Sequence, residues 1–166
     1  MKLIDFLALM NNDLKNEWTH LQFYLYHAST LSGPAQASYR EFLTDAAKSE
    51  MQHVQSFLDQ LLAAGYTESP AIAGHNFPVF SNLVDILTHA VSLEETVVAN
   101  YVERLSQLEV VAHEAPITAR YLTIFYEDQL RDSYEDAARM RRMLMTDLQQ
   151  VLATARRPNP EKSWDR

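Results

Sequence analysis

The chain has 166 residues, 47% of them hydrophobic, and a formal net charge of −8. This length suits a single domain with a sizeable core. The negative charge argues against nucleic acid as a partner, because phosphate binding needs a basic face. The absence of cysteine excludes disulfides and thiolate metal sites. It is consistent with the cytoplasmic location that we predict. No apolar run reaches the ~18 residues of a membrane span, and the N-terminus shows no signal-peptide pattern.

Four segments carry apolar residues in alternating steps of three and four, the spacing of amphipathic helices. They cover about residues 3–31, 43–61, 83–108 and 123–151. Between the second and third segments, residues 65–80 contain two glycines and two prolines, which indicates a long connection rather than a tight turn. The sequence therefore predicts an all-α fold, an antiparallel four-helix bundle made of two helical hairpins joined by this crossover. We place the bundle at residues 1–156 and an irregular tail at 157–166.

Glutamates occupy one core position in each predicted helix. The separation between Glu17 and Glu50 along the chain equals the separation between Glu94 and Glu127. The midpoint of the first pair falls on Gly33-Pro34, the predicted turn, so Glu17 and Glu50 should lie at the same depth. The second turn, near His113–Pro116, lies a few residues past the midpoint of its pair, so that hairpin is less symmetric. We expect all four glutamates in one buried layer.

Four buried carboxylates need a cation, because an unpaired buried charge costs several kcal/mol or more. His53 follows Glu50 by three residues, so both side chains lie on one helix face. Two divalent ions would balance four carboxylates, and a carboxylate-rich site with imidazole suits iron or manganese. Tyr24 and Tyr101 each follow a core glutamate by seven residues, where they could hydrogen-bond a ligand or simply pack.

Several segments resemble bacterioferritin. The matching stretches are Asn16-Glu17 with Gln22 to Ala28, Ser49-Glu50-Met51-Gln52-His53, Ser92-Leu93-Glu94, and Ile124-Phe125-Tyr126-Glu127. The resemblance covers about residues 1–150. It implies a ferritin-like iron-storage protein whose di-iron centre oxidises Fe(II) with O₂ or peroxide, a ferroxidase, and a homodimer or higher homo-oligomer. It also implies that Glu17 and Glu94 are terminal ligands, that Glu50 and Glu127 bridge, and that His53 caps one iron.

The sequence departs from bacterioferritin at the fourth helix. Leu130 stands where the family has a second histidine, which would leave one metal without its imidazole. His20 is a candidate substitute, because Glu17-Trp18-Thr19-His20 is itself a Glu-x-x-His motif. Arg131 offers another outcome, in which it pairs with Glu127 and the site holds less metal.

Two further departures concern haem and assembly. Met51 stands where the family's haem-binding methionine lies, but we favour an ordinary interface or surface methionine and keep haem as a secondary prediction. Residues 136–156 contain no Gly or Pro. We therefore expect one long fourth helix in place of the family's short fifth helix, which weakens the case for a closed shell.

Two alternative functions stay open at this point. One is a di-metal oxidase that acts on an organic substrate, which would need a pocket beside the metals. The other is a metal-free structural protein whose carboxylates are ion-paired.

Overall fold

The computed structural model describes residues 1–71 and 77–155, with side chains up to residue 146. Four long helices run through it, joined in the first hairpin by one 3-10 turn, η1 (Pro34–Gln36). The helices are α1 (Leu3–Thr30), α2 (Ala37–Ala63), α3 (Leu83–Val111) and α4 (Pro116–Ala155). The predicted all-α four-helix bundle is confirmed, whereas the predicted tail lies outside the described residues. No stretch of the described helices combines the length and the hydropathy needed to cross a lipid bilayer.

Each helix in the first hairpin ends where the local sequence favours a stop. Gly33 has φ of 87° and Gly65 has φ of 86°, a left-handed conformation that only glycine adopts at little cost. At the end of α2, the Tyr66 amide donates to the Leu61 carbonyl and the Gly65 amide donates to the Leu62 carbonyl. This is the Schellman motif, and Tyr66 and Leu61 complete it by packing in one apolar cluster.

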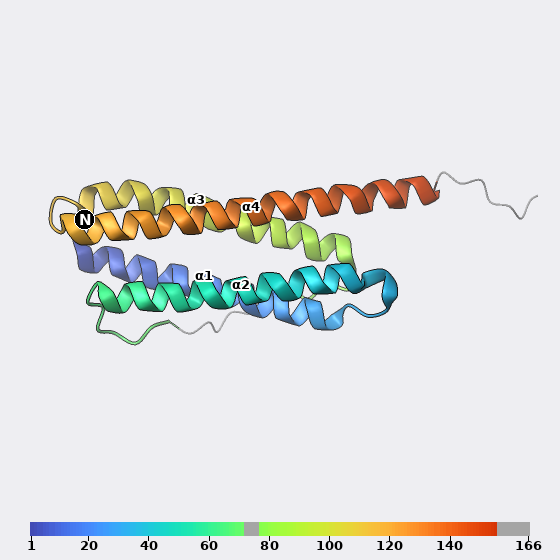
Figure 1. Cartoon of the computed structure of the whole chain (residues 1–166), viewed down its shortest axis with the longest axis horizontal. Helices are drawn as coiled ribbons and strands as arrows, with labels where there is room; N and C mark the ends of the chain where they lie inside the picture. Colours follow the sequence, from blue (N-terminus) through green and yellow to red (C-terminus); the bar gives the residue numbers. More distant parts are fainter. Residues whose placement is uncertain (72–76, 156–166) are drawn as a thin grey trace, which may run out of the picture.

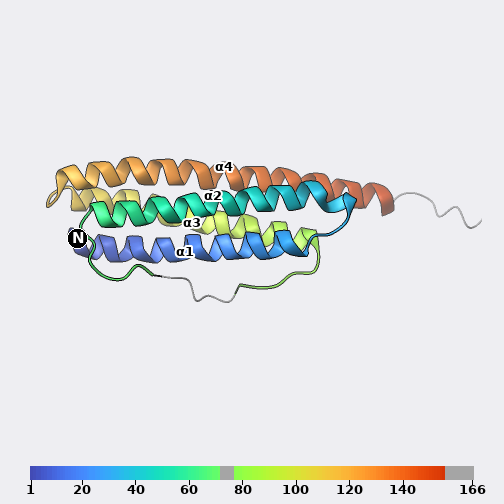
Figure 2. The same ribbon diagram turned by 60° about the horizontal axis from the view of Figure 1, so that its bottom comes forward.

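The described parts of the crossover between α2 and α3, residues 64–71 and 77–82, lie beside opposite ends of α1 (Figure 2). Near its start, the Ala71 amide donates to Asn11 Oδ1 at 2.8 Å, and near its end the Phe80 amide donates to His27 Nε2 at 3.2 Å. This path returns the chain to the far end of the bundle. As a result α3 runs parallel to α2 and antiparallel to α1 (Figure 1).

The buried core consists of two apolar clusters separated by a polar layer. One cluster includes Phe6, Met10, Phe57 and Tyr126, and the other includes Phe23, Leu43, Ile86 and Met140. The polar layer interrupts three helices at equivalent depths, between Leu14 and Leu21 on α1, between Ala47 and Val54 on α2, and between Ala90 and Val97 on α3. α4 continues without a break to Ala155 and projects beyond the other helices (Figure 1).

Candidate metal centre

Five ionisable side chains fill the polar layer, and all are at least 94% buried. They are Glu17, His20, Glu50, His53 and Glu94. α1 supplies the first two, α2 the next two and α3 the last. Each replaces an apolar residue at the core face of its helix, so the helical repeat alone directs these side chains inward.

These side chains form two groups that share Glu50. In the first group, His53 Nδ1 lies 3.2 Å from Glu17 Oε2 and 3.3 Å from Glu50 Oε2. In the second, His20 Nδ1 lies 3.7 Å from Glu94 Oε1 and 3.9 Å from Glu50 Oε1. Imidazole nitrogens and carboxylate oxygens bind metal ions at roughly 2 Å, so two ligands of one ion lie about 3–4 Å apart. Both groups have the separations that a metal ion requires.

His20 provides the clearest indication that this layer fits a metal. Its Nδ1 atom is buried and has no hydrogen-bond partner. A buried polar atom without a partner is rare in proteins and calls for an ion or a water molecule. Burial lowers the pKa of His20 and so favours the neutral imidazole, whose free lone pair can bind a cation.

Two tyrosines orient the outer glutamates reciprocally. The Tyr24 hydroxyl on α1 donates to Glu94 Oε1 on α3, and the Tyr101 hydroxyl on α3 donates to Glu17 Oε1 on α1. Each tyrosine therefore holds one oxygen of a carboxylate on the opposite helix. Of the two alternatives left open for Tyr24 and Tyr101, hydrogen bonding to a glutamate and simple packing, the structure shows the hydrogen bonds.

The pKa values of the cluster indicate how charge is distributed among its side chains when no metal is bound. Burial raises the pKa of Glu94 to about 8. Burial and the neighbouring Glu17 charge raise the pKa of Glu50 well above its usual range. Burial would also raise the pKa of Glu17 and lower that of His53. The hydrogen bonds within the cluster outweigh burial and shift the pKa of Glu17 to about 2 and that of His53 to about 11. These shifts favour an ion pair between Glu17 and His53 and protonated carboxyls at Glu50 and Glu94, an arrangement that limits the net charge of the buried cluster.

The prediction that Glu127 lies in the buried layer is wrong. Glu127 is exposed, and it lines a surface groove of about 420 Å³ between α3 and α4. The reason is the position of the turn. Glu17 and Glu50 are equally far from the helix ends that flank their turn, whereas Glu94 is farther from the end of α3 than Glu127 is from the start of α4. The position on α4 that matches Glu94 in this way is Ser133, which is buried and small.

The neighbours of Glu127 on α4 also lie outside the cluster. Leu130 packs against the apolar cluster that contains Phe57 and not among the side chains of the polar layer. Arg131 pairs with Asp128 at 3.1 Å on the surface. The predicted pairing of Arg131 with Glu127 among buried carboxylates is therefore wrong.

α4 instead brings two aspartates to the open side of the cluster, and the sequence pattern did not point to them. Asp132 Oδ2 lies 3.9 Å from His53 Nε2, and the Asp136 charge contributes to the raised pKa of Glu94. A correct position for the turn between α3 and α4 would have shown that this part of α4 lies at the depth of Glu94. The sequence pattern also did not point to a buried ion pair outside the cluster. In this pair, Arg104 donates to Asp13 through two nitrogens, at 2.8 and 3.1 Å.

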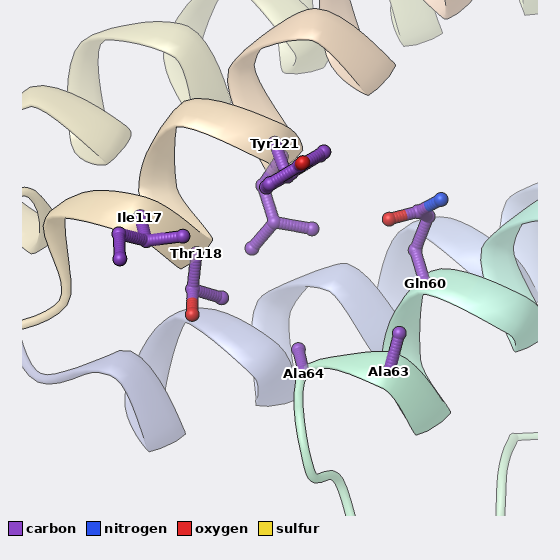
Figure 3. Close-up of a pocket in the computed structure, with 7 residues that line it drawn as sticks. Gln60, Ala63, Ala64, Ile117, Thr118 and Tyr121 are labelled. Atoms are coloured by element: carbon purple, nitrogen blue, oxygen red, sulfur yellow. The ribbon is translucent and has the colours of Figure 1, made fainter.

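The remaining predicted features lie at the surface. Met51 is 49% exposed on the outer side of α2, and haem binding there stays a prediction. Figure 3 shows a largely apolar pocket between Gln60 and Ala63 on α2 and Ile117 and Tyr121 on α4. Its volume is about 420 Å³. Gln60 lies almost three helical turns beyond Glu50 on α2, roughly 15 Å along the helix axis. This pocket is therefore not beside the candidate metal centre.

Comparison with known proteins agrees with this architecture of a four-helix bundle with a buried carboxylate and histidine layer. Residues 7–151 match the ferritin-like domain family, and the chain belongs to this family. The fold is similar to a crystal structure of ferritin like, diiron-carboxylate proteins from Bacillus anthracis str. Ames. The TM-score is 0.74 at 20% sequence identity, with 86% of this chain and 96% of that chain covered. No curated protein matches the sequence significantly.

Proposed function

We propose that this protein binds two Fe(II) ions as substrate in its buried layer and oxidises them with O₂ or peroxide, in the manner of a bacterioferritin. The observation that carries the proposal is the pair of ligand groups sharing Glu50, one completed by the unpartnered His20 Nδ1. A dinuclear centre in a helical bundle uses two Glu-x-x-His motifs and two further glutamates, and this cluster has all of these except one glutamate. The di-iron description of the similar Bacillus anthracis structure supports the same choice.

In this proposal the protein residues bind the ions, and the three carboxylates Glu17, Glu50 and Glu94 offset most of the charge of two Fe(II) ions. Glu17, Glu50 and His53 would hold one ion, and His20, Glu50 and Glu94 the other. Each Fe(II) gives one electron, so two Fe(II), one O₂ and two protons yield two Fe(III) and one hydrogen peroxide. The tyrosine hydroxyls keep Glu17 and Glu94 oriented as metal ions bind and leave. Iron detoxification would follow from this reaction, whereas iron storage would also need a closed shell.

Anaerobic titration with Fe(II), followed by addition of O₂, tests the proposal. We expect about two Fe(II) per chain and their oxidation on exposure to O₂. His20→Leu should bind about one, because its group loses the imidazole. Glu127→Gln is the matched control and should behave as the wild type, because Glu127 is exposed. Absence of bound iron, with no change in thermal stability on adding Fe(II), would contradict the proposal. A parallel titration with Mn(II) identifies the preferred metal.

We also propose that the chain forms a homodimer or a small homo-oligomer rather than a closed shell. The supporting observation is α4, which continues as one helix to Ala155. Light scattering on the purified protein measures the assembly mass directly. A mass corresponding to tens of subunits would contradict this expectation.

A further inference from the structure

The two ring nitrogens of His53 face different surroundings. Nδ1 lies inside the bundle, 3.2 Å from Glu17 and 3.3 Å from Glu50. Nε2 faces α4, where Asp132 Oδ2 is 3.9 Å away. The His53 side chain is 8% exposed and that of Asp132 is 44% exposed. His53 therefore links the buried cluster to a carboxylate at the surface.

Asp132 is held from its outer side. Arg131 lies 3.5 Å from Asp132 Oδ1, and it also pairs with Asp128 at 3.1 Å. Arg131 therefore contacts Oδ1 of Asp132. The other oxygen, Oδ2, is the one nearest the imidazole.

We infer that Asp132 is a positioning residue for metal binding, in which its carboxylate accepts a hydrogen bond from His53 Nε2–H and keeps Nδ1 directed at the metal. The inference rests on the proposed metal site. A neutral imidazole carries one N–H, so a metal on Nδ1 leaves the proton on Nε2. Histidine ligands in metalloproteins usually donate this second N–H to a carboxylate, a carbonyl or water, which fixes the tautomer and the ring orientation.

The proposed hydrogen bond between Asp132 and His53 gives α4 a role in metal binding. The two ligand groups by themselves give it none. Neither group contains a residue from α4 among the described residues. Asp132 would bring the fourth helix into the site indirectly, through His53. The 3.9 Å separation has to shorten to a hydrogen bond of roughly 2.8 Å, and a half-exposed side chain has the rotamer freedom to do this.

Co(II) binding by Asp132→Ala and Asp128→Ala tests the inference, because Co(II) gives visible bands and shifted proton resonances. Asp128 is the matched control, since it is on the same helix, is 55% exposed and pairs with the same arginine. We expect Asp132→Ala to weaken Co(II) binding about tenfold or more, and Asp128→Ala to leave it unchanged. The exchangeable His53 N–H resonance of the Co(II) protein should exchange faster with solvent in Asp132→Ala. Asp132→Glu should restore part of the affinity.

The outcomes separate this inference from the proposed function. If the wild type binds Co(II) and Asp132→Ala binds it equally tightly, with an unchanged His53 N–H signal, the inference fails and the proposed metal site stands. An equal loss in Asp128→Ala would assign the effect to surface charge and would also overturn it. If the wild type binds neither Co(II) nor Fe(II), the proposed function itself fails. The thermal midpoints of the metal-free variants show whether folding is intact.

Discussion

The two hairpins of the bundle contribute unequally to the candidate metal centre. The α1–α2 hairpin supplies Glu17, His20, Glu50 and His53, whereas Glu94 is the single contribution of the α3–α4 hairpin among the described residues. Yet the two glutamates of the sequence pattern are equally far apart along the chain in both hairpins. Equal spacing places two residues at the same depth only when the turn lies midway between them, and this holds in the first hairpin alone.

The two hairpins also differ in which of them contributes the second histidine of the candidate centre. The imidazole expected from α4 is absent, and α1 provides His20 in its place. Since His20 follows Glu17 by three residues, one helix face presents both a carboxylate and an imidazole. The centre is thus displaced toward the first hairpin, and α4 contacts it only from the outside.

The largest effect should come from the glutamate that both ligand groups share. Glu50→Gln should abolish binding of both ions, because each group loses a carboxylate. The metal-free protein should be as stable as the wild type or more stable, since burial already raises the pKa of Glu50 and a glutamine resembles the protonated carboxyl. Metal analysis and thermal unfolding with and without Fe(II) measure both effects. Two ions per variant chain would contradict the assignment.

A substitution at the contact between α1 of one hairpin and α3 of the other should cause a large loss of stability. Arg104 and Asp13 form a buried ion pair there, with side chains 9% and 1% exposed. Arg104→Met should cost about 3–5 kcal/mol, because it leaves a buried carboxylate without its cation. Urea unfolding at pH 7 measures the loss. Adding Asp13→Asn should recover most of it, and a single-variant cost below about 1 kcal/mol would show that the pair does not hold the hairpins together.

Metal binding should strengthen as the pH rises from 6 to 8. The raised pKa values of Glu50, Glu94 and His53 favour their protonated forms in the metal-free cluster, and bound ions would displace these protons. The folded-state pKa values of about 8 for Glu94 and about 11 for His53 exceed the ordinary values of 4.5 and 6.5. The metal-free protein should therefore lose stability over the same pH range.

Calorimetry in buffers of different ionisation enthalpy counts the protons released on binding Mn(II) or Co(II). Glu94→Gln should release fewer protons than the wild type and serves as the control. Binding that is independent of pH would show that the metal-free cluster does not store protons in this way.

The smallest effects are expected at the positions on α4 that the resemblance to bacterioferritin favoured. Glu127→Gln should change stability by less than about 0.5 kcal/mol, as is usual for surface substitutions. Leu130→His should add no metal and should cost about 1–2 kcal/mol, because Leu130 packs against the apolar core. Metal content and urea unfolding check both variants. A gain in bound iron or in oxidation rate by Leu130→His would show that α4 can reach the site after all.

Much of the fold and part of the centre could be predicted from local sequence. Helical periodicity, together with Gly33, Gly65 and the proline-containing crossover, indicated the four helices and their connections. Glutamates at core positions of α1, α2 and α3 indicated a buried layer, because a charged residue on an apolar helix face is costly unless it has a partner. The glutamate at the apparent core position of α4, Glu127, was misleading. Apolar residues follow a helical spacing on more than one face of α4, so the spacing does not identify which face is buried.

The sequence by itself determined the helical fold and a carboxylate layer that needs protons or cations, because both follow from patterns within single helices. The tertiary structure decided which face of α4 turns inward, and with it that Glu127 is exposed, Ser133 is buried and Asp132 lies beside His53. It also brought His20 within 3.9 Å of Glu50 and 3.7 Å of Glu94. The depth and rotation of one helix against another depend on packing along their whole length, which no local spacing records.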